Sequence, residues 1–152
     1  MDRKKINKII IVDFGSQVTQ LIARQVRELG VYCELINFKK FNKFKNLDTN
    51  IKGIILSGGP KSTLSKSAPS IKWKLFLNKL PLLGICYGHQ LVANICGGKT
   101  KYSNKKEFGS AELIEKKKSK LTEGFFIKKK NTVWMSHSDS VIIKPKNFNV
   151  IA

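Results

Sequence analysis

The chain has 152 residues, of which 41% are apolar and 26% charged, and its formal net charge is +19. This length and balance predict one domain, residues 1–152, with a hydrophobic core, and they exclude fibrous, collagen-like and wholly disordered proteins. The charge comes from 26 lysines and only three arginines, spread along the whole chain. Specific nucleic-acid binding favours arginine and interleaved aromatic residues. We therefore attribute the charge to codon-biased composition and expect no specific nucleic-acid partner, with a polyanion-binding protein as the weaker hypothesis.

Neither a membrane segment nor a metal site is expected. The longest apolar run, residues 9–12, has four residues, and the first residues lack the apolar stretch of a signal peptide. We therefore expect a cytoplasmic chain that does not associate with a membrane. The three cysteines, Cys33, Cys86 and Cys96, have no metal-ligand spacing, and only two histidines could assist them. The sequence thus predicts free thiols, with no disulfide framework and no zinc.

Strands alternate with a helix in the first half of the chain. Residues 8–13 are a short β-branched run that ends in a carboxylate, which predicts a buried parallel strand. The next segment has its apolar side chains in one helical stripe, and Gly30 ends it. Residues 31–36 and 51–57 are predicted as the second and third strands. The polar stretch 37–50 is assigned to no element.

The second half continues this alternation and then changes to shorter strands. A helix is predicted over 70–79, a strand over 80–85 and a further helix over 88–96. The whole pattern predicts an α/β fold, a doubly wound, mostly parallel sheet with flanking helices as in flavodoxin-like proteins, with a site at the carboxyl ends of the strands. Short strands are then expected at 108–115, 132–135, 141–143 and 150–151. Because the last of these runs to the end of the sequence, we expect the domain to be incomplete at its C-terminus.

A thiol between the fourth strand and the next helix carries the predicted chemistry. It lies in the sequence Gly84-Ile85-Cys86-Tyr87-Gly88. A nucleophile on so sharp a turn needs small residues two positions to each side, because the backbone is strained and flanking side chains would collide. The backbone N–H of Tyr87 can then donate to an oxyanion beside the thiol. A second N–H is available from Gly58-Gly59, at the end of the neighbouring strand.

Two other interpretations of these residues are weaker. Free cysteines are most often buried packing residues, a role that we assign to Cys33 and Cys96 but not to Cys86. The segment Ser57-Gly58-Gly59-Pro60 could be taken for a phosphate-binding loop. It lacks the following Lys-Ser/Thr pair, and Pro60 removes a backbone donor, so the sequence supports that interpretation only weakly.

Six blocks of sequence carry a family resemblance. They are residues 13–17, 23–32, 54–60, 84–90, 107–109 and 134–137, which include Ser57-Gly58-Gly59-Pro60, Cys86-Tyr87-Gly88 and Trp134-Met135-Ser136-His137. Together they resemble the glutaminase domains of GMP synthases, a branch of the class I glutamine amidotransferases. The blocks at 54–60 and 84–90 indicate the amidotransferase class, and those at 13–17 and 134–137 narrow it to the GMP synthase branch.

The resemblance implies a role for each matching residue. Cys86 would attack the side-chain amide of glutamine, and the N–H groups of Gly59 and Tyr87 would hold the oxyanion. The residues implied to line the glutamine pocket are Gly58, Gln90, Ser136, His137 and Ser138. The ammonia would pass to a synthetase domain or subunit that uses ATP and Mg²⁺ to aminate xanthosine monophosphate to GMP. The resemblance implies no cofactor and no metal in this chain itself.

One part of the family pattern is absent from this sequence. The family's general base is the histidine of a His-Pro-Glu segment, and no His-x-Glu occurs in the 152 residues. We do not expect His89 or His137 to replace it, because their predicted places are a helix flank and a pocket wall. Two hypotheses follow. Either further sequence or a partner supplies the His and Glu, or the chain is a catalytically impaired glutamine-binding or docking remnant.

Overall fold

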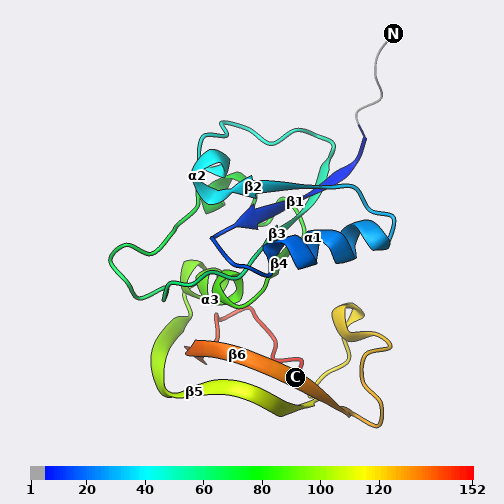
Figure 1. The fold of residues 1–152 in the computed structure, drawn as a ribbon, viewed down its shortest axis with the longest axis vertical. Helices are drawn as coiled ribbons and strands as arrows, with labels where there is room; N and C mark the ends of the chain where they lie inside the picture. Colours follow the sequence, from blue (N-terminus) through cyan, green and yellow to red (C-terminus); the bar gives the residue numbers. More distant parts are fainter. Residues whose placement is uncertain (1–5) are drawn as a thin grey trace.

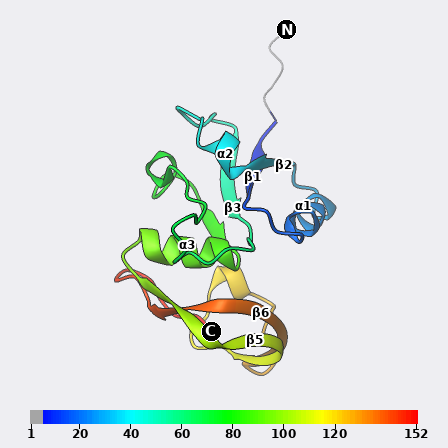
Figure 2. The same ribbon diagram turned by 60° about the vertical axis from the view of Figure 1, so that its left-hand side comes forward.

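The structure is a computed structural model that describes residues 6–152, except for the side chains of 103–107 and 138. A four-stranded parallel sheet with helices on its faces forms one part, and a two-stranded antiparallel hairpin forms the other (Figure 1). The helix α3, Tyr87–Ile95, lies between the two parts (Figure 2).

The parallel sheet has the strand order β2-β1-β3-β4. Its strands are β1 Lys8–Asp13, β2 Cys33–Asn37, β3 Ile51–Leu56 and β4 Leu82–Gly84. The β-branched residues of β1 and β3 favour strands in this position because layers cover both faces of the sheet. All three pairings are parallel, so the carboxyl ends of the strands meet at one edge. The predicted α/β fold with a mostly parallel sheet is confirmed.

Helices cover both faces of this sheet. The helix α1, Thr19–Glu28, packs Ala23 against Ile11 of β1, while Ile10 and Val12 face the opposite core with Leu91 of α3, Tyr87–Ile95. Successive residues of a strand point to opposite faces, which explains this division along β1. In the segment that the sequence analysis assigned to no element, α2 spans Phe38–Phe41, and the side chain of Asn37 caps it by accepting the Lys39 N–H.

The predicted helix over 70–79 is wrong. That stretch contains only the 3-10 turn η1, Trp73–Leu75, and Asn78 has a left-handed backbone with φ of 62°. Its apolar side chains do not form a helical stripe. Instead Ile71 and Phe76, which are 6% and 1% exposed, each pack separately into the core. This tertiary packing overrides the helical preference of the segment.

The short strands predicted after residue 99 are also incorrect in their bounds. Two long strands, β5 Lys99–Ile114 and β6 Lys130–Ile143, pair with each other, and η2, Lys120–Thr122, lies between them. Residues 150–151 form no strand, although the Ile151 carbonyl accepts the N–H groups of Lys116 and Lys117. The polar stretch around Ser136 and His137 resembled a loop in the sequence, but these residues continue β6.

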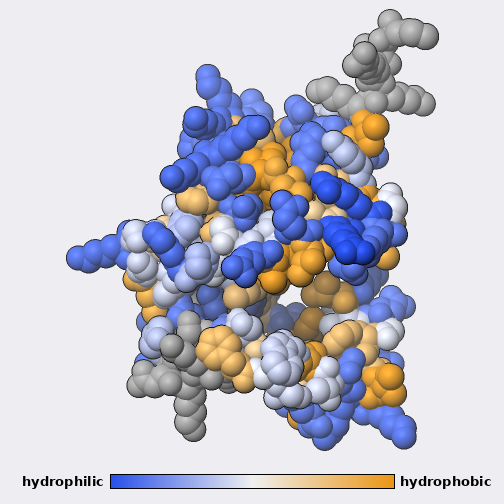
Figure 3. Space-filling model, in the orientation of Figure 1, coloured by the Kyte–Doolittle hydropathy of each residue, from blue (hydrophilic) through white to orange (hydrophobic). Residues whose placement is uncertain are grey.

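Both strands of the hairpin carry an exposed aromatic side chain. Trp134 of β6 is 78% exposed, and Phe108 of β5 is 65% exposed. Figure 3 shows the surface hollowed between the parallel-sheet region and the hairpin, with apolar side chains beside the hollow. Within residues 6–152, no helix is long and apolar enough to cross a membrane.

Candidate active site

Cys86 lies at the turn between β4 and α3, where it is the residue that precedes the first turn of the helix. Its backbone has φ of 52° and ψ of −111°, a conformation that is uncommon for a residue with a Cβ atom. The side chain is exposed, whereas Cys33 is buried and Cys96 is half-buried. An exposed thiol on a strained turn is typical of a functional position rather than a packing position.

Gly84 and Gly88 make this turn possible. A Cβ atom on Gly88 would lie 2.3 Å from the Leu56 carbonyl oxygen, and one on Gly84 would lie 2.7 Å from the Gly88 carbonyl. Both contacts are with backbone atoms, which cannot rotate away as a side chain could. The collision predicted for side chains two positions from Cys86 is therefore confirmed.

The end of β3 packs directly against this turn. The Ile85 N–H donates to the Leu56 carbonyl at 2.9 Å, and the Gly88 N–H donates to the Ser57 carbonyl at 3.0 Å. A Cβ atom on Gly58 would lie 3.6 Å from Cys86 Cβ, and one on Gly59 would lie 3.3 Å from Tyr87 Cγ. The glycine pair thus allows the two segments to approach closely.

Two backbone donors are available beside the thiol. Within the described part of the chain, neither the Gly59 N–H nor the Tyr87 N–H donates a hydrogen bond. The Tyr87 ring is 1% exposed, and its hydroxyl donates to the Pro69 carbonyl. Burial raises the pKa of Tyr87 to about 12. The phenol therefore anchors the start of α3 and does not titrate near neutral pH.

The opposite wall of the site comes from β6, about fifty residues further along the chain. The Cys86 Sγ lies 4.0 Å from the Ser136 carbonyl oxygen. Gln90 Nε2 donates to the Asp139 carbonyl at 2.8 Å and so joins α3 to β6. Since Gln90 is 6% exposed, this contact is shielded from water.

Asp139 is a residue that the sequence analysis missed. Its side chain is 3% exposed, and Ser62 Oγ donates to Asp139 Oδ2. The other oxygen, Oδ1, is buried and has no hydrogen-bond partner among the residues that the structure describes. A buried carboxylate oxygen without a donor is energetically unfavourable and suits a site that receives a cationic or N–H group. The available signal was its place two residues after His137, in a chain with only ten acidic residues.

These residues enclose a cleft of about 1230 Å³ between the parallel-sheet region and the hairpin. A smaller recess of about 180 Å³ lies at the thiol. Its lining includes Gly59, Cys86, Gln90, Ser136, His137 and Asp139. Pockets for drug-sized ligands occupy roughly 300–1,000 Å³, so this recess suits a smaller molecule.

The structure brings most of the predicted site residues together. Five of them line both the larger cleft and the recess: Gly59, Cys86, Gln90, Ser136 and His137. Gly58 lines the larger cleft only, and Tyr87 lies next to Gly59. The Ser138 side chain lies outside the described residues. His89 also lines the larger cleft. Partial burial, and then the neighbouring His137, lower the pKa of His89, so its imidazole is neutral near pH 7.

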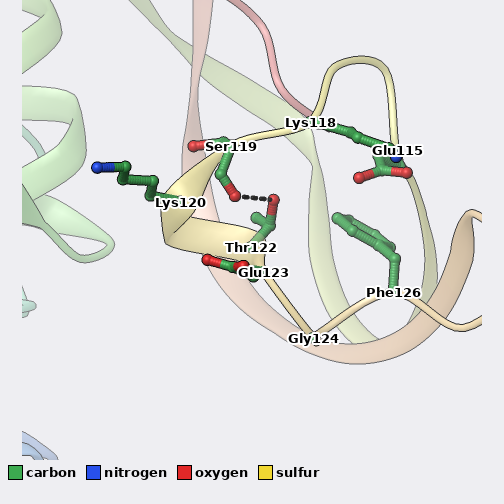
Figure 4. A pocket seen from close by; sticks show the side chains of 8 residues that line it. All are labelled: Glu115, Lys118, Ser119, Lys120, Thr122, Glu123, Gly124 and Phe126. Carbon is green, nitrogen blue, oxygen red and sulfur yellow. Dashed lines mark hydrogen bonds between the residues drawn. The ribbon is translucent and has the colours of Figure 1, made fainter.

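A second cavity lies in the segment between β5 and β6 (Figure 4). It measures about 570 Å³, and its lining includes Glu115, Lys118, Lys120 and Phe126. No cysteine or histidine lines it. Across the described part of the chain, no group of three His, Cys, Asp or Glu side chains could hold a metal ion. The chemistry that the side chains support is therefore concentrated at Cys86.

Comparisons with known proteins identify the family of the chain. The family model of class-I glutamine amidotransferases matches residues 10–152. The chain is 50% identical over 145 residues to the GMP synthase [glutamine-hydrolyzing] of Fusobacterium nucleatum and 46% identical over 147 residues to that of Cytophaga hutchinsonii. Each match covers 95% of this chain but 28% of the relative, so the chain spans little more than a quarter of these proteins.

Solved structures give the same assignment. A putative GMP synthase subunit from Thermoplasma acidophilum matches with a TM-score of 0.73 and 27% identity, covering 96% of this chain and 72% of that one. A glutamine amidotransferase from Thermotoga maritima, 18% identical, shares the fold with a TM-score of 0.71 over 92% of this chain and 64% of its own. The chain belongs to the class I glutamine amidotransferase family.

Proposed function

We propose that this chain is the glutaminase part of a GMP synthase, with Cys86 as its nucleophile. In this proposal Sγ bonds to the side-chain amide carbon of glutamine, and the electron pair of the carbonyl π bond moves to oxygen. The C–N bond then breaks, and ammonia leaves with the proton that the thiol gave up. Water cleaves the resulting thioester, which releases glutamate and regenerates the thiol.

The observation that carries this proposal is the exposed sulfur beside two unbonded backbone N–H groups, those of Gly59 and Tyr87. Donors already in place where negative charge develops lower the barrier, and each is worth about 3 kcal/mol in comparable enzymes. The Tyr87 N–H lies at the start of a hydrogen-bonded helix, and the carbonyl in the same peptide as the Gly59 N–H accepts the Ser57 hydroxyl, so both donors need little reorganisation during the reaction.

The recess suits recognition of an amino acid. In the proposal Gly58, Gln90 and the β6 segment Ser136, His137 and Ser138 line the bound glutamine. The unpartnered Oδ1 of Asp139 supports this assignment, because a buried carboxylate can pair with the α-ammonium group of a free amino acid. A peptide-linked glutamine has no such ammonium group and would bind less well.

The use of the ammonia is proposed from the relatives. Their printed name is GMP synthase [glutamine-hydrolyzing], and this chain spans 28% of their length. We propose that a synthetase domain or subunit with ATP and Mg²⁺ takes the ammonia and aminates xanthosine monophosphate to GMP. The proposed compartment for this reaction is the cytoplasm.

The general base is assigned outside the 152 residues. No His-x-Glu occurs in the sequence, so the proposal gives the base to a His–Glu pair from further sequence or a partner. A general base contributes about 10²- to 10⁴-fold, so these 152 residues alone should bind glutamine and react slowly with it.

Labelling at Cys86 tests the proposal. A chloroketone analogue of glutamine should form a single adduct on Cys86, detected by mass spectrometry of the digested chain, and glutamine should block it. Cys96 is the internal control, because it lies outside the recess and should not react. Cys86→Ala should remove the adduct. Labelling that glutamine does not slow would contradict the proposal.

A further inference from the structure

Ser57 is a buried residue that directly precedes Gly58 and Gly59 and is hydrogen-bonded to the start of α3. It directly follows β3, and its side chain is 0% exposed. Its backbone N–H donates to the Val12 carbonyl at 3.1 Å, and its carbonyl accepts the Gly88 N–H at 3.0 Å. Ser57 is thus bonded both to the centre of the sheet and to the helix that begins at the nucleophile.

The Ser57 hydroxyl oxygen receives two donors. The Phe14 N–H donates to Ser57 Oγ at 3.3 Å, and the Thr19 hydroxyl lies 3.1 Å from it as a donor. The Thr19 hydroxyl has one hydrogen, which it shares between Ser57 Oγ and Asp13 Oδ1 at 2.9 Å. With its oxygen occupied by these donors, Ser57 directs its own hydrogen to the Gly58 carbonyl at 2.9 Å.

This last hydrogen bond determines the orientation of a whole peptide unit. The Gly58 carbonyl and the Gly59 N–H belong to the same planar group, and none of the described peptide bonds is cis. In a trans peptide the C=O and N–H point in opposite directions. Since the Gly58 carbonyl points to a buried hydroxyl, the Gly59 N–H points away from that hydroxyl, and Gly59 is one of the residues that line the recess with Cys86.

We propose that Ser57 is a positioning residue, which holds the Gly58–Gly59 peptide so that the Gly59 N–H faces the developing oxyanion. The proposal rests on the glutaminase function proposed above. Glycine at both positions leaves this peptide free to rotate, so a bond to its carbonyl is needed to select one orientation. The hydrogen bonds that link Asp13, Thr19 and Ser57 supply that selection.

The test compares two reagents that alkylate the same sulfur. With the chloroketone analogue of glutamine, the Sγ–CH₂ bond forms, the C–Cl bond breaks and chloride leaves, while the ketone oxygen occupies the oxyanion position. Iodoacetamide makes the same kind of bond with loss of iodide, but it does not need that position. Ser57→Ala should lower the maximal rate of chloroketone labelling about tenfold, with the half-saturating concentration and the iodoacetamide rate unchanged.

Thr100→Val is the matched control. It removes another buried hydroxyl, which is 9% exposed, is bonded to Asn94 and Thr63, and belongs to a residue that does not line the recess. Its labelling rates should equal those of the unaltered chain. An unaltered chain whose labelling glutamine does not slow would refute the glutaminase function itself. A normal chloroketone rate in Ser57→Ala, or an equal fall for both reagents, would overturn the positioning role alone.

A second variant keeps the test decisive if Ser57→Ala does not fold. Thr19→Val removes one donor from Ser57 Oγ, which allows the Ser57 hydroxyl to turn away from Gly58. We expect the same selective fall in the chloroketone rate, of about threefold, with normal circular dichroism. An unchanged chloroketone rate in the folded Thr19→Val chain would also overturn the proposal.

Discussion

The parallel-sheet region and the β5–β6 hairpin contribute to the same cleft in different ways. The sheet region has a core of its own, in which Ile11 and Val12 are 0% exposed, and its backbone alone shapes the turn at Cys86. The hairpin has two strands, and large apolar side chains such as Ile142, at 57%, are exposed on it. Two-stranded sheets are marginally stable alone, so the hairpin depends on its contacts with the sheet region.

This difference separates the nucleophile from the wall that faces it. The position of Cys86 depends on close backbone packing, which tolerates almost no added volume. The β6 wall is joined to the sheet region by side-chain hydrogen bonds, from Gln90 and Ser62 to Asp139. We therefore expect changes in the turn to affect the whole fold, and changes in the joining contacts to affect mainly the hairpin.

The largest expected effect is that of Gly88→Ala. The new methyl group would lie 2.3 Å from the Leu56 carbonyl oxygen, so we expect a loss of at least about 3 kcal/mol in the free energy of unfolding. In Gly124→Ala, between β5 and β6, the new methyl group meets no atom within 4 Å, and only the left-handed φ of 74° is unfavourable. This variant should lose about 1 kcal/mol in the free energy of unfolding. Urea unfolding measures both. Equal losses would contradict the contrast between the two regions.

Gln90→Ala tests the joint between the regions. Without the amide the Asp139 carbonyl loses its buried donor, so we expect a loss of about 2 kcal/mol and faster hydrogen exchange in β6 than in β1. Gln25→Ala is the control, because that amide bonds the exposed Glu28 on α1 and should change stability by less than about 0.5 kcal/mol. Uniform acceleration of exchange across both regions would show that the hairpin does not open separately.

The same division explains how much the sequence could predict. The strands β1 and β3 and the turn around Cys86 were predictable because local physics determines them: β-branched runs favour buried strands, and two glycines flank the thiol. Gly58 and Gly59 were also recognisable, since a close approach of backbone requires residues without a Cβ atom. The predicted site residues that these local signals identify, Cys86, Gly58 and Gly59, do lie beside one another in the structure.

Features that depend on contacts with residues distant in the chain could not be predicted from the sequence. Ile71 and Phe76 would be apolar in either a helix or a loop, and only the structure shows that each packs separately into the core instead of forming the helix predicted for 70–79. In β6, His137 and Asp139 are polar, which favours a loop, yet they form a strand because they pair with β5 and line a cleft. The buried state of Asp139 depends on Ser62 and Gln90, which no local pattern connects to it.

The strain at Cys86 can be measured by comparing two substitutions. Cys86→Ala keeps a Cβ atom at φ of 52°, whereas Cys86→Gly removes it. The glycine variant should be more stable than the alanine variant by about 1 kcal/mol, and neither should form the chloroketone adduct. If alanine proves as stable as glycine in thermal unfolding, the turn stores no strain at the nucleophile.

The smallest expected effect is a pH dependence of stability that arises from His89 of α3 and its interaction with His137 of β6. Its pKa is lowered below 6.5, first by burial and then by His137 across the cleft, so the unfolded chain takes up this proton first as the pH falls. Stability should therefore decrease as the pH falls through 6.5 and level off below the folded pKa. His89→Gln should remove this decrease. His137→Gln should remove only its smaller part, because burial of His89 remains, and urea unfolding between about pH 8 and about pH 5 measures all three chains. A decrease that His89→Gln leaves intact would place the titrating group elsewhere.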